Sequence, residues 1–203
     1  MAVERIVNDP AAAAASIASG GRLERHAFEM VLDLAQSSPA PLVVDDFSIA
    51  PMNPDRVAEY GGVVSRAYPA EHPDHEPADS DAGSAAQVIL DVIRGESMGP
   101  WIAGASLHVA DRSDRIVGLI LVNETAASGT SVARPFVTDI CVDPAEAGHG
   151  LGTALLAASA GRVADLGWST LTLAVTVGNP AQRVYERLGF RVSSESWRIE
   201  TAG

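Results

Sequence analysis

Three glycines at alternate positions, Gly148, Gly150 and Gly152, constrain this chain more than any other feature. They follow PFVTDICVD, a β-rich run, and lead directly into a helical pattern over 151–166. Glycine allows positive φ angles and lets a ligand approach the backbone without striking a Cβ. The N–H groups at the start of a helix carry a partial positive charge that suits a phosphate. The segment therefore predicts a strand, a tight turn and a helix that bind a phosphate group.

Two nucleotide-binding patterns fit this segment poorly. The Walker pattern needs Lys and then Ser or Thr after its last glycine, whereas Gly152 is followed by Thr153. The dinucleotide fingerprint needs a parallel βαβ unit with an acidic residue about 20 residues later. Asp165 comes too early for that role and falls on the helix. A glycine-rich turn without any ligand is the plainer alternative for the triplet alone.

A second informative element, LAVTVGNPAQRVYERLGF, follows the predicted helix. It predicts a strand and then a short helix over 180–188, with Asn179 as its cap and Gln182 in the position of a capping box. Gly189 fits the end of this helix. Tyr185 shares a helix face with apolar residues, so we expect it to face the sheet. Periodicity alone favours a core tyrosine whose hydroxyl group is hydrogen-bonded within the protein.

Together the two elements resemble the coenzyme A-binding core of the GNAT superfamily of N-acetyltransferases. The family's Arg/Gln-x-x-Gly-x-Gly/Ala motif falls on residues 147–152 of VDPAEAGHGLGTALL, with Ala147 at the first position. The family's Asn at a strand end and its Tyr-x-x-x-Gly-Phe motif match Asn179 and Tyr185-Glu-Arg-Leu-Gly-Phe. The resemblance covers the chain from about residue 43 to residue 200 and leaves 1–42 uncovered.

The resemblance implies an α/β fold with a mixed, mostly antiparallel sheet splayed at its centre and flanked by helices. It implies acetyl-CoA as co-substrate, without a metal, and Tyr185 as the acid that protonates the departing thiolate. The pantetheine arm would pair with the backbone of one strand, the pyrophosphate would lie on the amides of the glycine turn, and a further residue would contact the cofactor. These cofactor-binding positions are Ile140, Cys141 and Val142, then Gly148, His149, Gly150, Leu151, Gly152 and Thr153, and finally Asn179.

The implied reaction is attack of a neutral primary amine, on a small molecule or a peptide, on the acetyl thioester. The base for this amine is left open between Asp139, Glu124 and a water molecule, because the position that some relatives use falls near Arg134. The interpretation that we prefer for Asp139 is a structural carboxylate bonded to backbone. We expect His149 to be exposed and Cys141 to be a small buried strand residue rather than a nucleophile.

The composition excludes several classes of partner. The formal net charge is -12 and the 14 Lys and Arg are scattered, so a nucleic-acid partner is not expected. Cys141 is the only cysteine, and no apolar run reaches membrane-spanning length, so we expect a cytoplasmic protein. The segment 70–83 has two histidines and five carboxylates without regular ligand spacing, and it is interpreted as a solvated loop rather than a metal site.

We expect two parts, an N-terminal helical extension over 1–41 and an acetyltransferase domain over 42–203. In the extension, Asp9 and Pro10 predict the start of one helix, and Gly20-Gly21 separates it from a second helix. The apolar stripe of that second helix must be buried on the domain or against another subunit, which favours a homodimer. The stripe consists of Leu23, Ala27, Met30, Val31 and Leu34.

The domain itself shows the pattern of a sheet with interspersed helices. A first strand is expected in 41–50, a helix over 53–69 with an interruption at Gly61-Gly62, and another helix over 84–96. Three antiparallel strands, a meander, are predicted next, and FRVSS and SWRIE are the closing strands. The alternatives to an enzyme are an acyl-CoA-binding sensor or scaffold and, less compatible with the motifs, an NAD-binding module.

Overall fold

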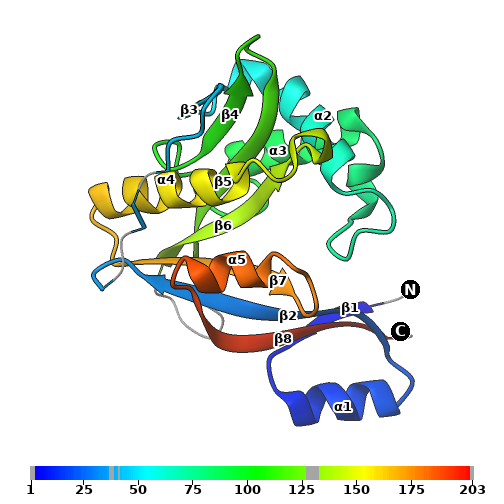
Figure 1. The fold of residues 1–203 in the computed structure, drawn as a ribbon. Helices are drawn as coiled ribbons and strands as arrows, with labels where there is room; N and C mark the ends of the chain where they lie inside the picture. Colours follow the sequence, from blue (N-terminus) through cyan, green and yellow to red (C-terminus); the bar gives the residue numbers. More distant parts are fainter. Residues whose placement is uncertain (1–2, 37–38, 41, 127–132, 202–203) are drawn as a thin grey trace. The chain divides into compact units, whose positions relative to one another are not determined.

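The structure, a computed structural model, describes residues 3–36, 39–40, 42–126 and 133–201. The chain forms two compact units. The larger one is Leu32–Thr172, and the smaller one combines Met1–Val31 with Leu173–Gly203. The ribbon in Figure 1 follows the chain through both units, which are described separately below.

The larger unit is built on an antiparallel meander of β4 (Leu107–Asp111), β5 (Ile116–Ala126) and β6 (Ala133–Val142). The short strand β3 (Phe47–Pro51) pairs with β4, and β7 (Thr170–Thr176) begins in this unit next to β6. The predicted meander is therefore confirmed. A first strand was expected in 41–50, and β3 is that strand, beginning later than expected because the chain before it is irregular.

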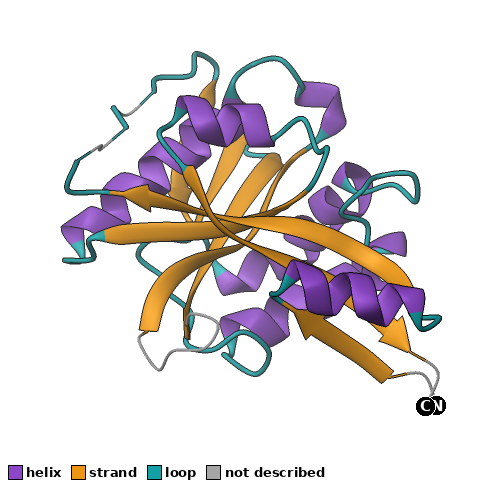
Figure 2. Ribbon diagram, turned by 90° about the horizontal axis from the view of Figure 1, so that it is seen from below, coloured by secondary structure: helices purple, strands orange, loops and turns teal. Residues whose placement is uncertain are grey.

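Helices cover both faces of this meander (Figures 1 and 2). On one face lie α2 (Val57–Ala67) and α3 (Ala82–Ile93), and on the other lies α4 (Leu151–Asp165). The face under α2 and α3 forms a hydrophobic core of fully or almost fully buried side chains, which include Tyr60, Ile89, Leu119, Leu121 and Cys141. Short 3-10 turns precede α2 (Pro54–Arg56), α3 (Pro77–Ser80) and α4 (Pro144–Glu146).

The helix expected over 53–69 is confirmed as α2 preceded by a 3-10 turn, but it is not interrupted at its two glycines. Gly61 lies against α3, where a Cβ would come within 2.3 Å of the Ala82 carbonyl oxygen and 2.6 Å of the Ala86 nitrogen. This glycine therefore serves close helix packing rather than a break in the helix.

The smaller unit contains β1 (Val3–Val7), α1 (Pro10–Ala18), the strand β2 (Arg22–Asp33) up to Val31, the last residues of β7, α5 (Gln182–Arg187) and β8 (Arg191–Thr201). Strand β8 pairs antiparallel with both β1 and β2. The Asp9 side chain accepts a hydrogen bond from the Ala12 N–H at 2.8 Å, which confirms the predicted cap of α1. The two predicted closing strands, FRVSS and SWRIE, are one continuous strand, β8.

The second helix expected in the N-terminal extension is wrong, because residues 22–33 form the strand β2. Two register shifts interrupt its pairing with β8, between Leu23 and Arg25 and between Glu29 and Met30. The extra residue at the second shift lies on β8 and not on β2. The irregular pairing breaks the regular alternation of buried and exposed positions along β2. Ala27 and Met30 are buried three residues apart, and this spacing resembles that of a helix.

The predicted apolar stripe is largely buried within this chain. Ala27, Met30 and Leu34 are 4%, 0% and 7% exposed, whereas Leu23 is 44% exposed. The stripe therefore gives no reason to expect a second subunit there, and the homodimer itself stays a prediction. The expected domain boundary falls on residue 41, which lies outside the described residues.

The fold class is confirmed as α/β, with a mostly antiparallel arrangement of eight strands among the described residues and with flanking helices. Within the described part of the chain, no helix is both long enough and apolar enough to span a bilayer.

Candidate active site

The glycine turn lies between β6 and α4, as the sequence predicts. Asp143 follows the last residue of β6, and its Oδ1 accepts a hydrogen bond from the Ala145 N–H at 3.0 Å, which caps the 3-10 turn. Gly148 and Gly150 then take φ angles of +89° and +73°, in the left-handed region that side chains with a Cβ rarely adopt. The two glycines turn the chain sharply enough for α4 to begin at Leu151.

The first turn of α4 has the features of an anion-binding site. Its first intrahelical hydrogen bond runs from the Ala154 N–H to the Gly150 carbonyl oxygen at 3.0 Å. The N–H groups of residues 151–153 therefore have no acceptor within the helix. A Cβ placed on Gly148 or Gly150 would meet no heavy atom of the described residues within 4 Å, so this side of the turn is open. These donors, with the helix dipole, fit a phosphate group.

Arginine side chains from elsewhere in the larger unit brace the turn through Asp143. Arg66, in the last turn of α2, donates from Nε to Asp143 Oδ2 at 2.8 Å, and Arg115 Nη1 lies 3.5 Å from the same oxygen. Arg115 also donates to Glu146 within the 3-10 turn at 2.6 Å. Burial alone would raise the pKa of Asp143, but the Ala145 N–H and the two guanidinium groups hold it below its usual value.

The strand segment predicted to pair with the pantetheine arm, residues 140–142, lies at the end of β6. Ile140, Cys141 and Val142 pair with Ile120, Leu119 and Gly118 of β5. A Cβ on Gly152 would lie 3.8 Å from Val142 Cγ2, so the end of this strand contacts the first turn of α4. The structure thus brings two groups of predicted cofactor-binding residues together.

Cys141 and His149 are placed as the sequence predicts. Cys141 is 6% exposed, and burial raises the pKa of its thiol well above the usual value, which disfavours the nucleophilic thiolate. The His149 side chain is 56% exposed, its Nδ1 lies 3.1 Å from the Glu146 carbonyl oxygen, and its ring is 5.6 Å from that of Phe47. Neither residue is placed as a base or nucleophile.

The candidate bases Asp139 and Glu124 lie on opposite faces of the sheet. Asp139 pairs with Leu121 of β5, on the face that α2 and α3 cover. Asn123 is on that face too, because its Nδ2 donates to the Val92 carbonyl oxygen of α3 at 3.1 Å. Successive residues of a strand point to opposite faces, so Glu124 points away from this side.

Tyr68 is a residue of this site that sequence reasoning missed. It caps the C-terminus of α2, and its hydroxyl donates to Asp139 Oδ1 at 2.7 Å. The carboxyl group of Asp139 is therefore bonded to a side chain distant in sequence, in addition to the Ile140 N–H. Burial raises the pKa of Asp139 to about 6, and the hydrogen bond from Tyr68 opposes this rise. No local pattern in the sequence connects residues 68 and 139.

The segment 70–83 follows Tyr68 and folds back on it. The ring of His72 is 5.0 Å from that of Tyr68, and His75 Nδ1 lies 2.8 Å from the Tyr68 carbonyl oxygen. Within the described residues, no three His, Cys, Asp or Glu side chains are grouped so that they could hold a metal ion.

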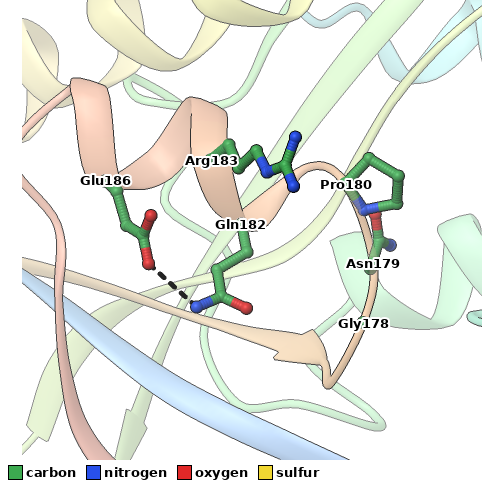
Figure 3. A pocket seen from close by; sticks show the side chains of 6 residues that line it. All are labelled: Gly178, Asn179, Pro180, Gln182, Arg183 and Glu186. Carbon is green, nitrogen blue, oxygen red and sulfur yellow. Dashed lines mark hydrogen bonds between the residues drawn. The ribbon is translucent and has the colours of Figure 1, made fainter.

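The remaining predicted site residues lie in the smaller unit, around the start of α5. Asn179 is 9% exposed, and its Oδ1 accepts from the Ala181 N–H at 2.8 Å. It therefore caps the turn that leads into α5, as predicted. Gln182 does not complete a capping box, because its Nε2 donates to Glu186 Oε1 at 2.8 Å instead (Figure 3).

An open pocket of about 340 Å³ surrounds this turn. The residues that line it are Gly178, Asn179, Pro180, Gln182, Arg183 and Glu186 (Figure 3). Its lining includes the guanidinium group of Arg183, the carboxylate of Glu186 and two side-chain amides, so it suits a ligand group that forms hydrogen bonds.

Tyr185 is half-buried on α5. Its ring lies 6.1 Å from that of Phe190. The helix ends as predicted, with Gly189 at a φ of +98° and the Phe190 N–H bonded to the Tyr185 carbonyl oxygen at 3.0 Å.

Comparison with known proteins agrees with this architecture. Residues 75–201 match the acetyltransferase (GNAT) domain family. A mycothiol acetyltransferase of Catenulispora acidiphila is 32% identical over 89% of this chain and 55% of its own length. A second, from Thermobispora bispora, is 30% identical over 89% of this chain and 59% of its own length. The chain thus spans little more than half the length of these relatives.

Solved structures share the fold at low sequence identity. A GCN5-related N-acetyltransferase from Sphaerobacter thermophilus superposes with a TM-score of 0.73 and 20% identity, over 99% of this chain and 59% of its own. A tandem GNAT protein from the clavulanic acid biosynthesis pathway gives a TM-score of 0.69 and 17% identity, over 98% of this chain and 63% of its own. With its glycine turn, its α/β architecture and this family match, the chain belongs to the GNAT family of acetyltransferases.

Proposed function

We propose that this protein transfers an acetyl group from acetyl-CoA to a primary amine of a small molecule. The observation that carries the proposal is the turn at Gly148 and Gly150, which opens the first turn of α4 to an anionic group. The relatives named mycothiol acetyltransferase support a small-molecule acceptor. A peptide amine is the second class of acceptor compatible with the family.

The residues present fit coenzyme A, which when bound would supply the activated acetyl thioester. The N–H groups of residues 151–153 would hold its pyrophosphate, and Asn179 would contact the cofactor. The backbone of Ile140, Cys141 and Val142 would pair with the pantetheine arm. A main-chain N–H near the end of β6 would polarise the acetyl carbonyl.

The acceptor amine must lose a proton before or during attack. An amine with a pKa of ~10.4 costs about 4–5 kcal/mol to present in neutral form at pH 7. A base in the site would lower this barrier. After attack, the hydroxyl of Tyr185 would donate a proton to the departing sulfur, and the half-buried position of its ring on α5 would hold that hydroxyl in place.

One observation supports a second candidate function, an acyl-CoA-binding sensor or scaffold. Ala147, an exposed residue, stands where the family motif has Arg or Gln. The backbone donors of the turn do not depend on this side chain. The chain can therefore bind an acyl-CoA through them even if it does not catalyse acyl transfer.

The test is acetyl-CoA turnover by the purified chain with a panel of small-molecule and peptide amines. Free thiol release gives the rate, and mass spectrometry identifies the acetylated product. An acetylated amine is the expected outcome. Coenzyme A binding by calorimetry without any acetylated product would instead support the sensor.

A further inference from the structure

One tyrosine proton lies between two acceptors on β6. The hydroxyl of Tyr68 is 2.7 Å from Asp139 Oδ1 and 3.0 Å from the Ile140 carbonyl oxygen. A phenol has a single proton to donate but can also accept a hydrogen bond. When Asp139 is ionised, Tyr68 can donate to it. When Asp139 carries a proton, it can donate to Tyr68, which then turns its own proton towards Ile140.

This arrangement keeps Asp139 hydrogen-bonded in both of its protonation states. A half-buried carboxyl group that lost its partner on gaining a proton would leave a buried polar group unsatisfied, which is unfavourable. Here the gain of a proton by Asp139 only reverses one hydrogen bond. Asp139 can therefore accept and release a proton without a change in the backbone.

The charges around the pair favour a cationic group as the proton donor. Asp74 and Asp79 lie close enough to raise the pKa of Asp139, together with the larger effect of burial. Tyr68 and the Ile140 N–H lower it, and the groups near Tyr68 include His72 and His75. With a pKa of about 6, the Asp139 carboxyl is largely ionised at neutral pH but is more basic than an ordinary aspartate.

A β-bulge lies beside Asp139, which is adjacent to residues 140–142, the segment proposed to pair with the pantetheine arm. Leu121 pairs with Asp139 and Val122 pairs with Val137, so Thr138 is the extra residue on β6. The Thr138 hydroxyl donates to Asn123 Oδ1 at 3.0 Å, which fixes the bulge. A bulge changes the direction of the neighbouring side chain, and here the neighbour is Asp139, which immediately precedes Ile140.

On the basis of the proposed function, we propose that Asp139 accepts the proton of the acceptor amine and that Tyr68 is the positioning residue that holds its carboxylate. The amine attacks in its neutral form, its nitrogen becomes cationic as it forms the bond to the acetyl carbon, and it then gives one proton to Asp139. The carbon–sulfur bond breaks with its electron pair on sulfur, which takes up a proton from Tyr185. Asp139 returns its proton to water and Tyr185 regains one, so protons balance over the cycle.

The test is the pH dependence of kcat/KM for the wild type, Asp139→Asn and Tyr68→Phe with one amine. Asp139→Asn should lose ~10²-fold or more in kcat and lose the acid limb of the profile. Tyr68→Phe keeps the ring but removes the hydrogen bond that lowers the pKa of Asp139. Its acid limb should therefore move to higher pH by about half to one unit. If the acid limb reported the ionisation of the amine substrate instead of Asp139, it would not move, because the same amine is used with each variant.

Tyr60→Phe is the matched control, since Tyr60 lies on the same helix and its hydroxyl contacts His108 Nδ1 at 3.1 Å in the core. It should lower the melting temperature without moving the acid limb. A wild-type limb in Tyr68→Phe, or wild-type turnover in Asp139→Asn, overturns the inference while acetyl transfer stands. If the wild type acetylates no amine in the panel, the proposed function and this inference both fail.

Discussion

Arg66 and Asp143 join the end of α2 to the start of the glycine turn through a 2.8 Å hydrogen bond. The Asp143 side chain is only 5% exposed, whereas that of Arg66 is 50% exposed. The arginine can therefore reorganise in water, but the carboxylate cannot. Asp143 also caps the 3-10 turn, so one buried carboxylate fixes both the direction of the chain and its contact with α2.

Asp143→Asn should lower the free energy of unfolding at pH 7 by about 1–3 kcal/mol, because the amide can still cap Ala145 but does not carry the charge that Arg66 faces. The pKa of Asp143 is lowered in the folded protein, so its contribution to stability is present above its unfolded pKa, near 4. It is lost as the pH falls through the folded pKa. Urea unfolding of both proteins between pH 7 and pH 3 should show the difference shrinking below about pH 4. A difference that does not change with pH would contradict the role of the charge.

Gly150→Asp should weaken coenzyme A binding by an order of magnitude or more, equivalent to a loss above about 1.4 kcal/mol. The substitution places a Cβ and a negative charge on the open side of the turn, at a φ of +73°. Calorimetry with coenzyme A measures the affinity, and far-UV circular dichroism checks the fold. Gly161→Asp is the matched control: it adds the same charge to the same helix, where a Cβ meets nothing within 4 Å and φ is not positive. Equal affinity for Gly150→Asp and the wild type would remove the assignment of the glycine turn as the pyrophosphate site.

Gly61→Ala should destabilise the protein by about 1–3 kcal/mol, because its Cβ would strike the backbone of α3. Gly62→Ala is the matched control one residue away. Its Cβ meets only the mobile end of Arg66, at 3.3 Å, so it should be neutral or stabilising by up to about 1 kcal/mol. Chemical denaturation of both variants measures the difference. Equal stabilities would show that α2 can shift away from α3.

These two glycines also illustrate which parts of the fold the sequence can predict. Helix α4, the meander and the glycine turn were predictable, because each has a local signal in periodicity or in turn residues. A pair of glycines is locally a helix breaker, and only the position of α3 shows that Gly61 is a packing residue. The strand β2 was missed for a related reason, since the irregularities in its pairing with β8 involve residues that are distant in sequence.

The candidate site also contains some features that have a local sequence signal and others that depend on contacts between distant segments. Backbone features such as the positive φ of Gly148 and the cap at Asn179 follow from residues that are adjacent in sequence. The contact of Tyr68 with Asp139 joins side chains from two distant segments, and no single-sequence pattern predicts it. Burial raises the pKa of Asp139, and this burial also depends on segments that are distant in sequence, so the shift was not predictable.

Tyr185→Phe tests the proposed acid most directly. The ring lies 6.1 Å from Phe190, and the variant keeps this contact while removing the hydroxyl. If the hydroxyl protonates the departing sulfur, kcat should fall by ~10²-fold or more with acyl-CoA binding almost unchanged. A hydroxyl that only satisfies a buried acceptor predicts about 1–3 kcal/mol less stability and little change in kcat.

Melting temperature and single-turnover rate, measured on the same Tyr185→Phe protein, separate these two roles. The pH profile of the rate adds a second criterion. A catalytic acid loses its proton at high pH and so sets the alkaline limb of the profile, whereas a base sets the acid limb. The loss in Tyr185→Phe should leave the acid limb that we assign to Asp139 in place, whereas Asp139→Asn should remove it. A destabilised variant with wild-type turnover would falsify the catalytic role of Tyr185. The sulfur would then take its proton from water, and the assignment of the glycine turn at Gly148 and Gly150 would be unaffected.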